Sequence, residues 1–192
     1  MSVTVIIPTI APRRDLLTRA INSVLNQTVP VDQIIVSMDH EKLGAAANRQ
    51  KALESVTTEF VLPLDDDDEL KPNGVELLLA HQSATDADMV YGHYDVIGGD
   101  DPRPENLGRD FDPLNPVQTT IVVLSKTSLA QKCGYVNPQD GPLNSPDRLY
   151  AGEDWYFIQQ ALANNYSISH CPHKVFDWYH HGANTSGLPK NW

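Results

Sequence analysis

A short apolar run that ends in four consecutive aspartates is the feature that most constrains the fold of this chain. Residues 60–64 read FVLPL, and Asp65–Asp68 follow directly. Two carboxylates about 5 Å apart repel by roughly 3 kcal/mol at an effective dielectric near 20, so a packed fold needs something that offsets these charges. A divalent cation is the usual partner, because hard cations prefer carboxylate oxygen. The alternative is a solvated turn after an edge strand.

Length and charge narrow the class of protein. A chain of 192 residues fits a single domain, and 41% hydrophobic residues are ordinary for a globular core. A net charge of −11 leaves no basic stripe for a phosphate backbone, which argues against strong nucleic-acid binding. With no membrane span and no signal peptide visible, we expect a cytoplasmic protein. Cys133 and Cys171 lack CxxC spacing and are expected to be reduced, buried thiols.

Apolar segments of strand length alternate with amphipathic segments of helix length. We expect strands at residues 3–7, 34–38, 60–64, 89–97, 120–124 and 175–180. We expect helices at residues 13–27, 125–133 and 155–163, and two more that begin near Gly44 and Pro72. Residues 98–116 and 138–146 are rich in Gly, Pro, Asp and Asn and are predicted to be loops. The alternation predicts an α/β fold with a mainly parallel central sheet and helices on both faces.

Polar residues stand where three of the expected strands end. Pro8 and Thr9 follow the first strand, Asp39 ends the second, and the aspartate run follows the third. Ligands of parallel α/β sheets bind beyond the carboxyl ends of the strands. We therefore expect these three strand ends to line one crevice.

Six segments carry a further pattern in a fixed order. They read SVTVIIPTI, RAINSVLNQTVPVDQIIVSMD, GAAANRQKAL, LDDDDEL, AGEDWYFIQQAL and HHGANTSG. Together they cover nearly the whole chain and resemble the family 2 glycosyltransferases of the GT-A fold. The resemblance implies one GT-A-like domain over residues 1–192, with a nucleotide-sugar half at about 1–97 and an acceptor half at about 98–192. It also implies transfer of a sugar from a nucleoside-diphosphate sugar, UDP-linked, to an acceptor hydroxyl.

On the donor side, the resemblance implies contacts from several strand ends. Pro8 and Thr9 belong to a turn that contacts the nucleotide, and Asp39 holds its base or ribose. Arg49 faces the diphosphate or the sugar. The alternatives are that Asp39 is only a cap or turn residue and that Arg49 is exposed to solvent. Gln50 stands where the family usually has Asn, which leaves the donor sugar open.

The aspartate run divides its roles in the same resemblance. Asp65 contacts the nucleoside and Asp67 ligates a metal, while Asp66 could share either role. His181 or His180 adds a nitrogen ligand; the alternative is that both are partly buried strand residues. Such a mixed set suits Mn²⁺ at least as well as Mg²⁺. A metal at this place stabilises the charge that develops on a diphosphate leaving group.

Glu153 and Asp154 open the expected helix near residue 155, where the helix dipole stabilises a carboxylate. The resemblance implies that this segment holds the general base, with Asp154 as the base and Glu153 in support. One carboxylate with no opposing nucleophile predicts a single displacement with inversion. The alternative is an acidic pair that only caps the helix.

Two other classes of protein also fit a clustered aspartate site. A metal-dependent nucleotidyltransferase or phosphohydrolase would use such a cluster, but would not explain the GEDW and HHGANTSG segments. A non-catalytic nucleotide-sugar binding module is the second class. Zinc at His170, Cys171, His173 and Cys133 is disfavoured because the spacing fits no closed site. The acceptor stays open, since a glycan, a protein side chain, a lipid-linked sugar or a modified base all fit.

Overall fold

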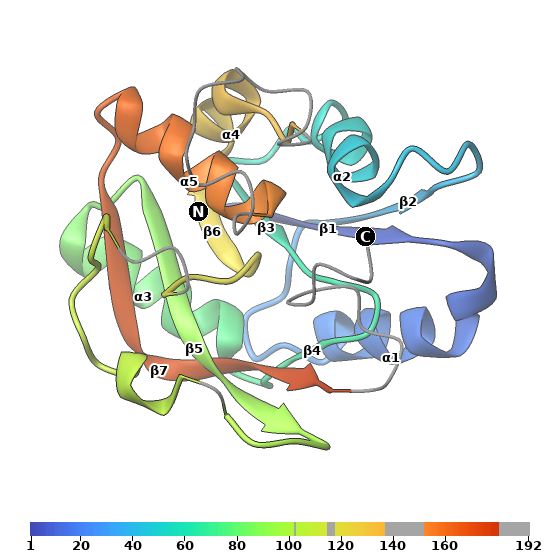
Figure 1. The fold of residues 1–192 in the computed structure, drawn as a ribbon, viewed down its shortest axis with the longest axis horizontal. Coiled ribbons are helices and arrows are strands. Elements are labelled where there is room, and N and C mark those ends of the chain that lie inside the picture. Colours follow the sequence, from blue (N-terminus) through green and yellow to red (C-terminus); the bar gives the residue numbers. More distant parts are fainter. Residues whose placement is uncertain (102, 115–117, 137–151, 181–192) are drawn as a thin grey trace.

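In the residues that the structure describes, 1–101, 103–114, 118–136 and 152–180, seven strands form one mixed sheet (Figure 1). The structure is a computed structural model. Across the sheet the strands follow the order β2-β1-β3-β6-β5-β7-β4. Their bounds are β1 Val3–Thr9, β2 Gln33–Met38, β3 Phe60–Pro63, β4 Glu69–Leu70, β5 Met89–Ile97, β6 Val123–Lys126 and β7 Ile168–Tyr179.

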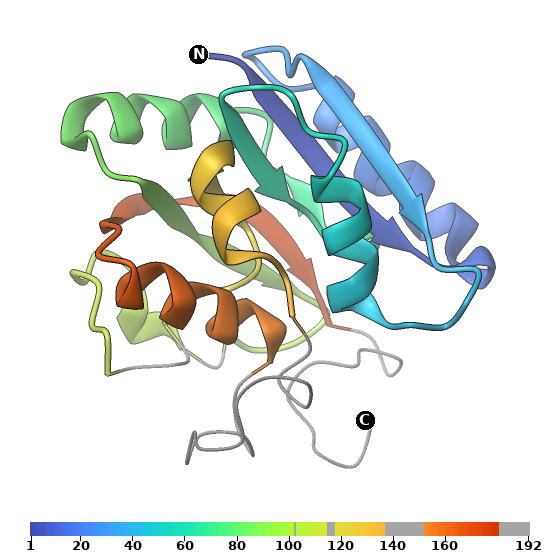
Figure 2. The same ribbon diagram turned by 90° about the horizontal axis from the view of Figure 1, so that it is seen from above.

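Helices cover both faces of this sheet, as the sequence predicts. Helices α2, α4 and α5 lie on one face, and α1 and α3 lie on the other (Figures 1 and 2). The bounds are α1 Arg14–Leu25, α2 Ala45–Leu53, α3 Gly74–Thr85, α4 Thr127–Cys133 and α5 Glu153–Ala163. The described residues also form two short 3-10 helices. The first, η1 Ala11–Arg13, precedes α1, and the second, η2 Pro104–Asn106, lies in the predicted loop after β5.

Most of the strand pairing is parallel, which confirms the predicted fold class. β1 pairs in parallel with β2 and β3, and β5 pairs in parallel with β7 over the longest ladder. The exceptions are β6, which runs antiparallel to β3 and β5, and the two-residue β4, which runs antiparallel to β7. Every residue of β1 is buried, as expected of a strand in a sheet that is covered on both faces.

Several predicted boundaries were wrong for identifiable reasons. β1 continues through Pro8 to Thr9, so these residues end a strand and do not form a turn. Pro8 lies beyond the last β1–β3 pair, Ile6 with Pro63, where its missing N–H removes no bond to β3. β7 begins seven residues earlier than predicted because Pro172 falls in an irregular stretch of the β5–β7 ladder. The short strand β4 was not predicted.

The other elements differ by shorter shifts. β6 begins at Val123, three residues later than predicted, and α5 begins at Glu153, two residues earlier. Cys171 is buried as predicted, but Cys133 is only partly buried; both thiols are free. The predicted loop at 138–146 lies outside the described residues. No helix among the described residues has the length and apolarity needed to cross a membrane.

Candidate active site

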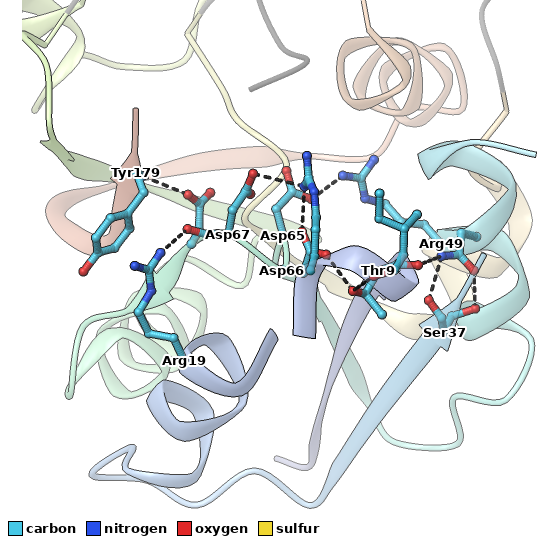
Figure 3. Close-up of polar contacts among 12 residues, drawn as sticks. Thr9, Arg19, Ser37, Arg49, Asp65, Asp66, Asp67 and Tyr179 are labelled. Carbon is cyan, nitrogen blue, oxygen red and sulfur yellow. Dashed lines mark hydrogen bonds and ion pairs between the residues drawn. The ribbon is translucent and has the colours of Figure 1, made fainter. Parts of the chain in front are cut away.

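The carboxyl ends of β1, β2 and β3 meet at one edge of the sheet, as predicted. The backbone N–H of Asp39 donates to the Thr9 carbonyl at 2.9 Å, and the Thr9 hydroxyl donates to Asp66 Oδ2 at 2.6 Å. Asn48 of α2 fastens the same edge, since its Nδ2 donates to the carbonyls of Ser37 and Thr9 at 2.6 and 3.3 Å. The polar contacts that follow run across this edge from Tyr179 to Ser37 (Figure 3).

Three of the four aspartates in the run, Asp65, Asp67 and Asp68, form one cluster of carboxylates. One oxygen atom from each of Asp65, Asp67 and Asp68 lies within 4.8 Å of the others. Asp66 is the exception: it is buried and turned toward Thr9 and Arg13. The structure thus brings Asp65 and Asp67 together, and it adds Asp68, to which the sequence analysis assigned no role. Hard carboxylate oxygens in this number suit Mg²⁺ or Mn²⁺.

Asp68 has a strongly raised pKa. Burial, followed by the charge of Asp65, raises the pKa of Asp68 to about 9. Its Oδ1 accepts the backbone N–H of Tyr179 at 3.0 Å, which opposes this rise but does not reverse it. A nearby cation would lower this pKa again, so the site favours a positive ligand.

Two arginines, Arg13 of η1 and Arg19 of α1, lie against the aspartate run. Arg13 Nη1 donates to Asp66 Oδ1 at 2.8 Å and to Asp67 Oδ2 at 3.1 Å. Arg19 Nη2 donates to the Asp67 carbonyl at 2.8 Å, and its guanidinium lies 3.7 Å from the centre of the Tyr179 ring. Neither arginine was singled out from the sequence. A pair of cations six residues apart on an amphipathic helix was the available signal.

Arg49 connects the aspartate run to the beginning of α5. Its side chain is only 4% exposed, and its two terminal nitrogens form ion pairs with Asp65 and Glu153. Burial works against the charge, yet these two carboxylates raise the pKa of Arg49 above its usual value. The alternative of a solvent-exposed arginine is therefore wrong. Arg49 instead joins two acidic segments that are 88 residues apart in the sequence.

Asp154 lies in the first turn of α5, next to the Glu153 that Arg49 holds. Its Oδ1 accepts the backbone N–H of Trp155 at 2.8 Å. Burial, and then the charge of Glu153, raises the pKa of Asp154 to about 6. A carboxylate with this pKa is ionised near neutral pH and is a stronger base than an exposed aspartate. The N-cap residue of α5 is Gly152, and within the described part of the chain no side-chain hydrogen bond caps this helix.

Asp39 closes a turn between β2 and α2. Its two carboxylate oxygens accept the backbone N–H groups of Leu43 at 3.0 Å and Gly44 at 2.9 Å. Burial raises the pKa of Asp39, but the backbone N–H groups of this turn together outweigh burial and lower that pKa below its usual value. Gly44 has φ of +90°, a conformation that favours glycine and that starts α2. Beyond its neighbours in the chain, no atom of the described residues lies within 4 Å of where its Cβ would be, so the glycine serves the turn.

His180 is exposed and directly follows β7, outside the carboxylate cluster. Its backbone N–H donates to the Ile97 carbonyl at 2.8 Å. Its side chain borders a cavity of about 520 Å³ between η1, α1 and the end of β7. Ile10, Leu16 and Tyr179 supply apolar walls to this cavity, and Arg13 reaches it from η1 and Arg19 from α1. His181 and the rest of the HHGANTSG segment lie outside the described residues.

Within the described residues, the carboxylate cluster of Asp65, Asp67 and Asp68 is the arrangement that could hold a metal ion. No candidate metal-binding group among the described residues includes His170, Cys171, His173 or Cys133.

Comparison with known protein families identifies the chain. The profile described as Glycosyl transferase family 2 matches residues 34–130, which is just over half of the chain. The chain belongs to glycosyl transferase family 2. A search among curated proteins found no match.

Solved structures of a Staphylococcus aureus protein, TarS, share this fold. TarS 1–349 in complex with UDP-GlcNAc matches with a TM-score of 0.76 and 17% identity over 98% of this chain and 62% of that one. TarS 1–349 in complex with UDP gives 0.71 and 17% over 95% and 62%, and TarS itself gives 0.71 and 19% over 94% and 37%. The chain thus spans about three-fifths of TarS 1–349, and at such identities the likeness concerns the fold.

Proposed function

We propose that this protein is an inverting, metal-dependent glycosyltransferase. It moves a sugar from a nucleoside-diphosphate sugar, UDP-linked, to an acceptor hydroxyl. The observation that carries the proposal is the carboxylate cluster after β3, which Arg49 links to the Glu153–Asp154 pair. Membership of the family supports it, and so does the fold shared with a protein that was solved with UDP and with UDP-GlcNAc.

Asp65, Asp67 and Asp68 are the residues that would hold the metal, Mn²⁺ or Mg²⁺. Their hard oxygen atoms fit such an ion. The raised pKa of Asp68 means that its ionised carboxylate is disfavoured by its surroundings, and a nearby cation would stabilise it. When bound, a divalent ion supplies charge that stabilises a diphosphate leaving group. His180 and His181 remain proposed as further contributors, and Asp66 has its carboxylate directed elsewhere.

Asp154 is the proposed general base. It would accept the proton of the acceptor hydroxyl as that oxygen attacks the sugar from the face opposite the leaving group. Its partial burial keeps the carboxylate basic, and Glu153 adds a negative charge beside it. Arg49 fixes Glu153 and so supports the beginning of α5. Direct attack by the acceptor oxygen, with Asp154 as the base, would be a single displacement that inverts the configuration at the sugar carbon.

The donor and acceptor would lie on different parts of the chain. We assign the donor to residues 1–97, where Pro8, Thr9 and Asp39 end β1 and β2 at the same edge as the aspartates. We assign the acceptor to residues 98–192, which include Asp154. The acceptor itself stays open among a glycan, a protein side chain, a lipid-linked sugar and a modified base.

Thermal unfolding with UDP, in Mn²⁺ and in EDTA, tests the donor site. A ligand that binds the native state at a hundredfold excess over its dissociation constant stabilises it by about 2.7 kcal/mol. We expect UDP to raise the unfolding temperature in Mn²⁺ and not in EDTA. Equal shifts in both would contradict metal dependence.

Product analysis then tests the reaction class. With UDP-GlcNAc and Mn²⁺, we expect slow release of UDP as the sugar is transferred to water, and faster release of UDP when the true acceptor is added. Release of pyrophosphate from a nucleoside triphosphate and a sugar phosphate would indicate a nucleotidyltransferase instead. Binding of UDP without release of any product would indicate a binding module.

A further inference from the structure

The aspartate run is partly neutralised by the protein itself. Four carboxylates follow one another, and two guanidinium groups contact three of them: Arg49 pairs with Asp65, and Arg13 pairs with Asp66 and Asp67. At an effective dielectric near 20, each such contact offsets a repulsion of a few kcal/mol between neighbouring carboxylates. The two arginines therefore act as countercations of the metal-free site.

These two arginines differ in how firmly they are held. The Arg49 side chain is 4% exposed and is fixed between carboxylates of two distant segments. The Arg13 side chain is 23% exposed and borders the cavity of about 520 Å³ beside α1. Arg13 thus has both access to solvent and space into which its guanidinium can move.

Asp67 contacts Arg13 and also belongs to the carboxylate cluster. Its Oδ2 accepts Arg13 Nη1 at 3.1 Å, while an oxygen of the same residue belongs to the group that spans 4.8 Å with Asp65 and Asp68. A divalent ion at this group and the guanidinium would compete for one carboxylate, and their like charges would repel.

The position of the aspartates does not depend on Arg13 alone. Arg19 holds the Asp67 carbonyl, the Asp68 N–H donates to the Asp65 carbonyl at 3.2 Å, and Thr9 holds Asp66. Removing the charge of Arg13 would therefore change the electrostatics of the site more than its geometry.

We infer that Arg13 is a displaceable countercation, which positions Asp67 in the metal-free protein and yields that carboxylate when a divalent ion binds. Its charge then lowers the affinity of the site for the ion and makes metal binding reversible. The inference rests on the proposed function only in placing an ion at Asp65, Asp67 and Asp68.

Titration calorimetry with Mn²⁺ alone tests the inference, with Arg13→Gln as the main variant. Glutamine keeps a donor for Asp66 but removes the charge, so we expect Mn²⁺ to bind about tenfold more tightly or better. Arg13→Lys keeps the charge and should stay near the wild-type affinity. Arg14→Gln is the matched control, because it removes the same charge from the adjacent exposed residue and should change the affinity little.

Thermal unfolding of the same variants supplies a second readout. In EDTA the Arg13→Gln protein should unfold at a lower temperature than the wild type, and saturating Mn²⁺ should close this gap. Unchanged or weaker Mn²⁺ binding by Arg13→Gln would overturn the inference. An Arg13→Gln protein that is unfolded with and without Mn²⁺ would do so too, because Arg13 would then hold the fold.

The outcome separates this inference from the proposed function. If no variant and no wild type binds Mn²⁺, no ion competes with Arg13 and the inference fails, while release of UDP from UDP-GlcNAc still decides whether the protein is a transferase. If Mn²⁺ binds as expected but no UDP is released, Arg13 keeps the inferred role and the transferase proposal fails.

Discussion

Charging of His170 should destabilise the fold in mild acid. This residue of β7 is 9% exposed, its Nε2 accepts the Gly108 N–H at 2.8 Å, and its ring lies 4.7 Å from that of Tyr91. Its Nδ1 is buried and has no hydrogen-bond partner among the described residues. Burial, followed by the charges of His93 and His81, lowers the pKa of His170 to about 4.

The magnitude follows from the difference between the folded and unfolded pKa values. In the unfolded chain an imidazole has a pKa near 6.5, so between pH 6.5 and 4 the unfolded state binds a proton that the folded state does not. The free energy of unfolding therefore falls as the pH falls through this window. Between pH 8 and pH 5 this group should remove about 2 kcal/mol of stability, from 1.36 kcal/mol per pKa unit.

Urea unfolding at pH 8 and pH 5 in EDTA, followed by tryptophan fluorescence, measures this loss. Asp68 and Asp154 have raised pKa values and act in the opposite direction, so the wild-type curve alone is no test. The comparison is with His170→Gln, whose loss between the two pH values should be smaller by about 2 kcal/mol. Exposed His40→Gln is the control and should behave as the wild type. Equal losses in wild type and His170→Gln would refute the argument.

Three further predictions concern the site and the packing around it. Asp154→Asn should lower transfer about a hundredfold or more, with the affinity for UDP and Mn²⁺ unchanged, as steady-state kinetics and calorimetry would show; near-full activity would place the base elsewhere. Asp68→Asn should leave the unfolding temperature in EDTA at or above the wild-type value, since the ionised carboxyl is disfavoured there, but weaken Mn²⁺ binding at least tenfold. Gly74→Ala should cost about 1–3 kcal/mol in urea unfolding, because its Cβ would lie 2.4 Å from the Val175 carbonyl oxygen; Ser83→Ala in the same helix is the exposed control.

The α/β architecture could be predicted because its signals are local. The buried strands β1 and β3 are continuous apolar runs, and α1 shows apolar residues at helical spacing. The antiparallel direction of β6 could not be predicted, since its neighbours β3 and β5 are chosen by packing over long distances. Similarly, the irregular stretch that admits Pro172 into β7 depends on its partner β5.

The site could be predicted where a residue's type and its place at a strand end coincide. Asp65 and Asp67 lie together in the short segment that follows the end of β3 at Pro63. The pairing of Arg49 with Glu153 could not be read from the sequence, because 104 residues separate them and no spacing rule relates them. For the same reason the contacts of Arg13 and Arg19 emerged only when the fold placed α1 against the loop between β3 and β4.

The four aspartates, which look alike in the sequence, are handled in four different ways. Asp65 is paired with Arg49, Asp66 is held by Thr9 and Arg13, Asp67 is shared with Arg13, and Asp68 accepts a backbone N–H with its pKa raised. The repulsion that points to a cation in the sequence is thus reduced within the chain, by contacts that need no metal. Such contacts would let the proposed metal site fold without its ion, in contrast to metal domains that are unfolded without theirs.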